Sequence, residues 1–292
     1  MDLKRMPLFP AGTILWKEKE MLNKEMAERA ADNLRQIREK RPLIHNISNF
    51  VVMNFTANAL LACGASPVMA HAPEEVEEMV SLAGALVLKI GTLTREWIET
   101  MLKAGRRANE LNVPIVLDPV GSGATQLRTH SAKRLIDELE INVVRGNASE
   151  VLSLSEEGSL TKGVDALHSV EEVAETAIHL SQKLGTTLAI TGKEDLVTDG
   201  KRVCRVMNGH QLMGYVTGTG CTATAIMGAF LAVCADSTAA ATTSLAYFGL
   251  AGERAAGSAT GPGSFQVALL DALYDMDLEG MKEEIAISVN EG

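Results

Sequence analysis

Residues 114–123 read Pro-Ile-Val-Leu-Asp-Pro-Val-Gly-Ser-Gly, a short apolar run followed at once by a polar, glycine-rich loop. A run of this kind is typical of a strand that is buried on both faces of a sheet. Further apolar runs occupy residues 85–90, 141–144 and 187–190. Stretches rich in Ala, Glu and Leu precede or separate these runs, at residues 74–82, 95–111, 131–139 and 170–184. Strands that alternate with helices predict an α/β fold with a central, mostly parallel sheet flanked by helices.

The segments outside this alternation predict further helices and a hairpin. Residues 17–40 space their apolar side chains at intervals near 3.6, which predicts an amphipathic helix. Residues 197–206 hold an Asp-Gly pair between short strand candidates, so we expect a hairpin at the edge of the sheet. The C-terminal third, residues 220–276, has a helical composition. Since no repeat or linker interrupts the sequence, we expect a single domain over residues 21–292, preceded by an N-terminal extension over residues 1–20.

Composition and charge exclude several classes of protein. The chain has 292 residues and a formal net charge of −10, which argues against a general nucleic-acid binder, because such proteins need a cationic face. The four cysteines form no C-x-x-C pair and no metal-ligand spacing, which indicates reduced thiols. The most apolar stretch, residues 223–235, is shorter than the roughly 20 residues of a membrane span, and no secretory leader is recognisable. We therefore expect a cytoplasmic protein that binds neither nucleic acid nor a membrane.

Polar side chains follow each predicted strand at the point where the strand ends. Asp118, Arg145 and Thr191 come directly after three of the apolar runs, and Asn147 and Glu150 follow shortly after Arg145. In an open α/β sheet, ligands bind outside the carboxyl ends of the strands. Any one of these residues could simply form a turn or cap a helix. Their expected position at one shared edge favours a ligand site.

Residues 218–221, Gly-Thr-Gly-Cys, precede a run of helix-forming residues. Glycine lets the backbone approach an anion closely, and the first turn of a helix offers unpaired N–H donors and about half a positive charge. The segment therefore predicts a cradle for a phosphate or another oxyanion. Residues 218–223 also fit a loose Gly-x-Gly-x-x-Ala dinucleotide pattern, but no strand-end acid follows about 20 residues later. A Walker A loop is excluded, because no Gly-x-x-x-x-Gly-Lys-Ser/Thr occurs.

Cys221 stands at the start of this predicted helix. A thiol near unpaired N–H groups and a helix dipole should have a lowered pKa, and it could serve as a base or a nucleophile. The alternative is a small buried residue without a chemical role. No histidine lies nearby in the sequence to make a Cys–His pair evident.

A series of motifs runs in order along the chain. They are HNISN at 45–49, NFTAN at 54–58, GASPVM at 64–69, APEEV at 72–76, IGTL at 90–93, DPVG at 118–121, RGNASE at 145–150, GTGC at 218–221 and GPGSF at 261–265. From about residue 30 to about residue 275, this series resembles the hydroxyethylthiazole kinase family. The resemblance implies a ribokinase-like fold and transfer of the γ-phosphoryl group of ATP to the hydroxyl of 4-methyl-5-(2-hydroxyethyl)thiazole, in thiamine salvage. It also implies Mg²⁺ and a homotrimer with active sites at the subunit interfaces.

The resemblance also assigns roles to residues, position by position. Thiazole-site positions fall on Met69, Gly218 and Asn49, and ATP-site positions on Arg145, Thr191, Gly220 and Asn147. Positions that organise Mg²⁺ fall on Asp118 and Glu150, and Cys221 stands where sugar kinases of the superfamily carry an Asp base. Two positions depart from the family pattern, since Ser48 replaces a usual Thr and Lys89 replaces a common Asn.

The sequence is also compatible with other functions. A nicotinamide-dependent oxidoreductase would use residues 218–223 as its fingerprint. A non-catalytic binding protein on the same fold would keep the thiazole contacts without the ATP machinery. Within the kinases, a pyrimidine or pyridoxal kinase is the nearest competitor.

Overall fold

A sheet of nine strands crosses the part of the chain that the computed structural model describes, residues 11–155 and 170–291. The strand order is β2-β1-β3-β4-β5-β6-β7-β8-β9. The first six strands in this order are parallel, and each of the last three runs antiparallel to the strand before it. The strands are β1 Leu43–Ile47, β2 Ser66–Val68, β3 Ala85–Lys89, β4 Ile115–Asp118, β5 Val143–Asn147, β6 Thr187–Thr191, β7 Asp195–Thr198, β8 Arg202–Val206 and β9 Ile287–Glu291. The predicted α/β fold with a mostly parallel sheet is confirmed.

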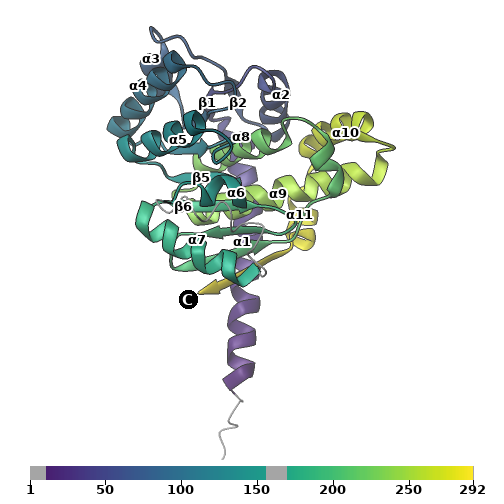
Figure 1. Ribbon diagram of the computed structural model, residues 1–292. Coiled ribbons are helices and arrows are strands. Elements are labelled where there is room, and N and C mark those ends of the chain that lie inside the picture. Colours follow the sequence, from purple (N-terminus) through teal and green to yellow (C-terminus); the bar gives the residue numbers. More distant parts are fainter. Residues whose placement is uncertain (1–10, 156–169, 292) are drawn as a thin grey trace, which may run out of the picture.

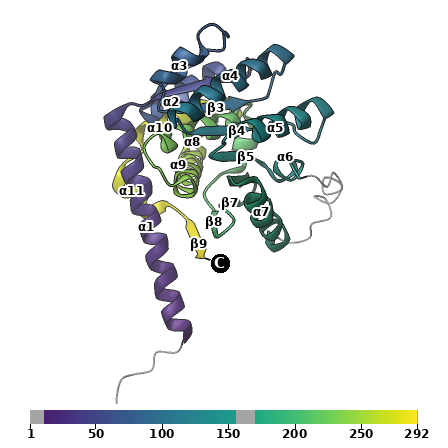
Figure 2. The ribbon, with the colours of Figure 1, turned by 90° about the vertical axis from the view of Figure 1, so that its left-hand side faces the viewer.

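Helices cover both faces of the sheet (Figure 2). One layer contains α1 Ala11–Lys40, α2 Met53–Cys63, α8 Thr219–Leu231, α9 Ser237–Ser258, α10 Pro262–Asp275 and α11 Leu278–Glu284. The other layer contains α3 Val76–Leu82, α4 Arg95–Leu111, α5 Gln126–Glu138, α6 Ala148–Leu152 and α7 Val170–Leu184. A short 3₁₀ helix, η2 Gln211–Tyr215, comes before α8. The amino-terminal part of α1 extends beyond the body of the molecule (Figure 1).

The parallel strands are buried on both faces because alternate side chains enter the two layers. In β3, Val87 packs in the core of the α8 layer, whereas Leu86 and Leu88 pack in the core of the α4 layer. All three side chains are fully buried. A strand with two buried faces needs apolar residues at every position, which explains its continuous apolar run.

The four predicted strands and the predicted helices are present, with small shifts at their ends. The predicted hairpin is also present, since β7 and β8 pair around Asp199 and Gly200. Its expected position at the edge is wrong, because β9 pairs with the outer side of β8. β9 could not be predicted from local sequence patterns, because four α-helices and a 3₁₀ helix separate it from its partner β8 in the sequence. Its Val289 N–H also donates to Asn23 Oδ1 of α1 at 2.9 Å, so β9 is held on two sides.

The predicted amino-terminal helix is longer than expected. It begins at Ala11 instead of residue 17 and continues through residue 20 without a break. Residues 1–10 of the predicted extension lie outside the described residues, and the boundary at residue 20 stays a prediction. Within residues 11–155 and 170–291, no helix is long and apolar enough to cross a membrane.

Candidate active site

The strand-end residues gather at one edge of the sheet, as their positions in the sequence predict. Lys89 and Asp118 are paired across β3 and β4. Arg145 of β5 lies beside Asp118, with 3.9 Å between Nη1 and Oδ2. Its Nη2 donates to Thr191 Oγ1 of β6 at 2.7 Å. Side chains from four neighbouring strands therefore form a row, which we call the charged row: Lys89, Asp118, Arg145 and Thr191.

The amino terminus of α8 packs against the charged row. Thr224 Oγ1, in its second turn, donates to Asp118 Oδ2 at 2.7 Å. At Gly220, a Cβ atom would lie 2.9 Å from Arg145 Nη1, so a larger residue would have to displace the guanidinium from its present position. Gly218 caps the helix with φ at 91°, a left-handed conformation that glycine adopts without strain. The backbone conformation thus requires glycine at position 218, and the glycine at position 220 leaves room for the Arg145 guanidinium.

Asp118 is 1% exposed, and its Oδ1 has no hydrogen-bond partner among the described residues. Burial raises the pKa of this carboxyl, while Arg145 and Thr224 act in the opposite direction. A buried carboxylate oxygen without a partner is costly, because its desolvation is not compensated. The free oxygen therefore marks a place where a cation or a water can bind.

Asn147 and Glu150 form a capping box at the start of α6. The Asn147 side chain accepts from the Glu150 N–H, and the Glu150 carboxylate accepts from the Asn147 N–H, both at 2.9 Å. The other carboxylate oxygen of Glu150 accepts from the Gly121 N–H at 2.8 Å. Glu150 therefore joins the loop after β4 to the loop after β5. The predicted ATP role of Asn147 and metal role of Glu150 stay predictions.

Cys221 lies in the first turn of α8, where Asn49 Nδ2 donates to its Sγ at 3.6 Å. Burial raises the pKa of the Cys221 thiol, and the Asp118 carboxylate raises it further, which outweighs the effects of Lys89 and Arg145. The predicted lowering of this pKa is therefore wrong. Burial of the thiol and the nearby Asp118 carboxylate of β4 therefore dominate over any effect of the helix dipole.

Of the three residues expected to bind thiazole, two lie beside this helix start. Asn49 contacts Cys221, and a Cβ at Gly218 would lie 2.8 Å from Val52 Cγ1 in the loop that follows Asn49. Met69 directly follows β2, the outer neighbour of β1, and it is half-buried. Gly91 was assigned no role in the site from the sequence. A Cβ at this position would lie 2.6 Å from the Asn49 side chain, so the glycine leaves room for Asn49.

A cavity of about 840 Å³ opens beside the charged row. Arg145, Thr191 and Gly220 line one part of it, and Met213 and Phe248 provide apolar lining. The segment of residues 207–214, which borders the cavity, was not predicted from the sequence. Its two glycines, at 209 and 214, indicate a loop but no ligand.

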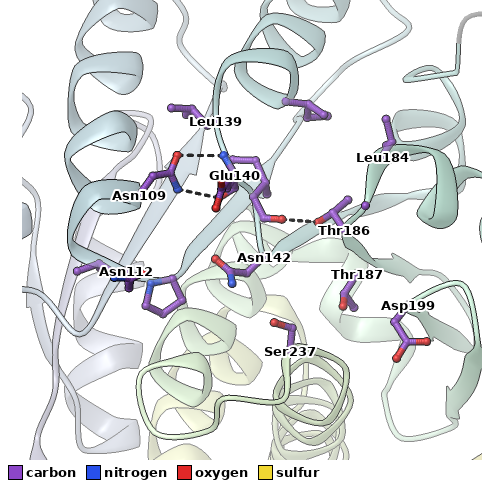
Figure 3. A pocket seen from close by; sticks show the side chains of 15 residues that line it. Asn109, Asn112, Leu139, Glu140, Asn142, Leu184, Thr186, Thr187, Asp199 and Ser237 are labelled. Carbon is purple, nitrogen blue, oxygen red and sulfur yellow. Dashed lines mark hydrogen bonds between the residues drawn. The ribbon is translucent and has the colours of Figure 1, made fainter.

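A second cavity, of about 570 Å³, lies at the opposite, amino ends of the strands (Figure 3). Three of its polar side chains, Asn109, Asn142 and Thr186, bond to the protein backbone. Asn109 exchanges two hydrogen bonds of 2.9 Å with the backbone of Glu140, and Asn142 Oδ1 accepts from the Ile115 N–H at 2.8 Å. Thr186 Oγ1 donates to the Ile141 carbonyl at 2.7 Å. These side chains stabilise the strand starts, and none of the predicted site residues lines this cavity.

Solved structures support the fold independently of the sequence motifs. A structure of hydroxyethylthiazole kinase from Pyrococcus horikoshii OT3 superposes with a TM-score of 0.82 at 45% identity, covering 90% of this chain and 99% of that one. A ribokinase-like superfamily protein from Enterococcus faecalis V583 superposes with a TM-score of 0.60 at 14% identity, over 86% and 93% of the two chains. The second likeness concerns the fold alone, and it makes the fold ribokinase-like.

Sequence comparison covers the same region. The family model described as "Hydroxyethylthiazole kinase family" matches residues 34–279. A hydroxyethylthiazole kinase from Desulfotalea psychrophila is 65% identical over 254 residues, which are 87% of this chain and 93% of the relative. Both matches include the charged row and the start of α8. The chain belongs to the hydroxyethylthiazole kinase family.

Proposed function

We propose that the protein transfers the γ-phosphoryl group of ATP to the primary hydroxyl of 4-methyl-5-(2-hydroxyethyl)thiazole, as a step of thiamine salvage. The observation that carries this proposal is the contact between the amino terminus of α8 and the pair Asp118 and Arg145, beside a cavity of about 840 Å³. Phosphoryl transfer needs positioning and charge neutralisation more than covalent chemistry. The charged row and the helix start supply both.

ATP fits the cavity with its phosphates toward the charged row. Arg145 and the N–H groups of the first turn of α8 can bind phosphate oxygens, and the Thr191 hydroxyl holds the Arg145 guanidinium in place. Met213 and Phe248 offer apolar surface to the base. In this arrangement Gly220 keeps the backbone N–H groups within reach of the same phosphates as Arg145.

Mg²⁺ fits the carboxylates of Asp118 and Glu150. Asp118 has a buried oxygen without a partner, and the Glu150 carboxylate lies close enough to raise the pKa of Asp118. Mg²⁺ is usually held by one or two carboxylates together with phosphate oxygens and water. When bound, it neutralises charge on the phosphates. The described residues contain no group of three or more His, Cys, Asp and Glu that could hold a metal, which suits a site completed by the nucleotide.

Cys221 serves in this proposal as the base that accepts the proton of the acceptor hydroxyl. The contact of the thiol with Asn49 and its position in the helix turn that follows Gly218 support this role. Because its pKa is raised, little thiolate is present at neutral pH, and the rate of the wild-type enzyme should rise with pH in the alkaline range. A loose transition state demands little negative charge on the nucleophile, so we expect a modest contribution.

This role is tested by comparing Cys221→Ala with Cys221→Asp in kcat measurements over pH 6–10. We expect Cys221→Ala to lose the alkaline rise, and Cys221→Asp to keep activity at lower pH, because a carboxylate is ionised there. If both variants keep the kcat and pH profile of the wild type, Cys221 is not the base.

A homotrimer with active sites between subunits is the assembly that we propose. On the thiazole side of the site, Phe50 and Val51 directly follow Asn49 and are 63% and 68% exposed. Adjacent large apolar side chains at a binding loop suit an interface more than open solvent. Light scattering on the purified protein should give three times the mass of the chain, and a monomeric mass at full activity would contradict the proposal.

The function is tested by an ATP-consumption assay on three acceptors, hydroxyethylthiazole, hydroxymethylpyrimidine and pyridoxal, with and without Mg²⁺. We expect turnover of the thiazole alone, and only with Mg²⁺. Absence of thiazole turnover would overturn the proposal, and turnover of one of the other acceptors would replace it.

The geometry does not favour a nicotinamide-dependent oxidoreductase. In a dinucleotide fingerprint the glycine segment follows a strand of a βαβ unit. Here Gly218 follows the 3₁₀ helix Gln211–Tyr215 and the helix after it leads into another helix. The glycines serve the contact with Arg145 and Val52 instead.

A further inference from the structure

Lys89 is a buried lysine without a partner. It is the last residue of β3 and is 0% exposed. Within residues 11–155 and 170–291, its Nζ makes no hydrogen bond. A buried, unpaired charge lowers the free energy of unfolding. Its presence therefore calls for a functional reason that offsets this loss of stability.

The side chain of Lys89 faces the α8 layer at the phosphoryl-transfer site. Two residues earlier on β3, Val87 packs against α8, where a Cβ at Gly228 would lie 2.7 Å from Val87 Cγ2. Because side chains alternate along a strand, Lys89 faces the same layer, nearer the amino terminus of α8. The titratable groups that act on its ammonium, in order of strength, are Cys221, Asp118 and Arg145.

The charges of the row alternate across three strands, with Lys89 and Arg145 on either side of Asp118. The row therefore has one positive charge in excess, in a chain whose net charge is −10. Among the described residues, the Thr222 hydroxyl of α8 is also buried without a partner. Lys89, Arg145 and this hydroxyl can donate to an anion, whereas the unpaired Asp118 oxygen can bind only a cation or a donor.

We propose that Lys89 is a positioning residue of phosphoryl transfer, whose ammonium stabilises the transferred anionic group through space. The inference rests on the proposed function and concerns the same site. In that reaction the bond from the γ-phosphorus to the bridging oxygen breaks, and its electron pair leaves with ADP. A new bond joins phosphorus to the acceptor oxygen, whose proton passes to the Cys221 thiolate. The charge of the ammonium acts on the phosphoryl group while it lies between the two oxygens.

The first test replaces Lys89 by an apolar side chain of similar length, Lys89→Met. Without ligands, we expect a thermal midpoint equal to or above that of the wild type, because the buried charge is gone. We expect kcat to fall at least tenfold, with the KM of the thiazole within twofold. In the absence of acceptor, the Kd of ATP should rise at least fivefold more than the Kd of ADP, because only ATP carries the γ-phosphoryl group. Lys103→Met on α4 removes the same charge outside the site and should leave kcat, the KM of the thiazole and both Kd values unchanged; its thermal midpoint is not compared, because Lys103 pairs with Glu77 and the Pro73 carbonyl.

A second variant distinguishes the loss of the Lys89 charge from a change in packing. Lys89→Ala should lose activity and recover at least part of it with propylammonium, but not with propanol, which has similar size and no charge. An unchanged kcat in Lys89→Met, a joint loss of stability and activity, or equal rescue by both compounds would overturn the proposal. If the wild type does not phosphorylate the thiazole, the proposed function fails, and the ratio of ATP and ADP affinities still decides the role of Lys89.

Discussion

The carboxyl and amino ends of the parallel strands each border a cavity, but the polar side chains at the two ends differ in how they are paired. At the amino ends, Asn109, Asn142 and Thr186 all bond to backbone groups. At the carboxyl ends, Lys89 Nζ and Asp118 Oδ1 are buried and have no partner among the residues that the structure describes. Buried polar groups are normally satisfied, so exceptions need an explanation. Missing partners among the described residues therefore distinguish the carboxyl ends, which we propose as the reactive end, from the amino ends, the structural end.

The largest expected effect is a loss of kcat on substitution of Asp118 at the carboxyl ends of the strands. Asp118→Asn keeps an oxygen that can accept from Thr224 but removes the charge. We expect kcat to fall roughly 10³-fold, as for loss of a central electrostatic group, and stability to fall as well, since Lys89 and Arg145 lose the buried carboxylate that lies between them. Kinetic assays and thermal melts of the same preparation check both. Nearly normal kcat would show that the unpaired carboxylate has no part in the reaction.

The second largest effect is expected on removal of the Arg145 guanidinium, which lies next to Asp118. For Arg145→Ala we expect the KM of ATP to rise and kcat to fall, each by roughly tenfold, because the phosphates lose a charged donor. Steady-state kinetics with varied ATP measure both constants. Unchanged values for both would remove Arg145 from the nucleotide site.

At the structural end, the expected effect is on stability alone. Asn142→Ala leaves the Ile115 N–H at the start of β4 without its acceptor. Loss of such a partner costs about 1–3 kcal/mol. Urea denaturation should show this decrease in the free energy of unfolding, while kcat stays within twofold of the wild type. A large loss of kcat without loss of stability would make the amino-end cavity functional and break the comparison.

The smallest expected effect is a pH-dependent loss of stability on substitution of Asp199. Burial raises the pKa of Asp199, at the rim of the amino-end cavity, but hydrogen bonds from Arg202 and Lys201 outweigh this and lower it to about 2. A folded-state pKa below the unfolded value of 3.8 adds stability above pH 4, which is lost as the pH falls toward 2. Asp199→Asn should thus cost up to about 2 kcal/mol at pH 7, and little at pH 2. An equal deficit at both pH values would contradict an ionic origin.

Much of the sheet could be predicted because its central strands are buried on both faces. Continuous runs such as residues 85–90 are strong signals, whereas β1 contains His45 and Asn46 and β2 is a three-residue strand around Pro67. β9 depends on a partner that lies far away in the sequence.

Strand-end residues such as Asp118 and Arg145 were predicted in the same way, as polar positions after apolar runs, whereas Met69 and Asn49 were assigned only from the family resemblance. The sign of the pKa shift at Cys221 could not be predicted, because burial and the neighbouring Asp118 are properties of the folded chain. The cavity lining at Met213 and Phe248 also depends on tertiary packing. Lys89 was visible in the sequence as a departure from the family, but its missing partner is visible only in the structure.

The pairing of β9 with β8 has a consequence for synthesis on the ribosome. Until residues 287–291 have emerged, β8 presents an open row of N–H and C=O groups to other chains. Domains begin to fold from their amino terminus during translation, so the nascent protein passes through a stage with this edge exposed. β9 then covers the edge and bonds to Asn23 of α1, which lies 266 residues earlier in the sequence. Slow translation of the segment that carries β9 should therefore increase aggregation of nascent chains.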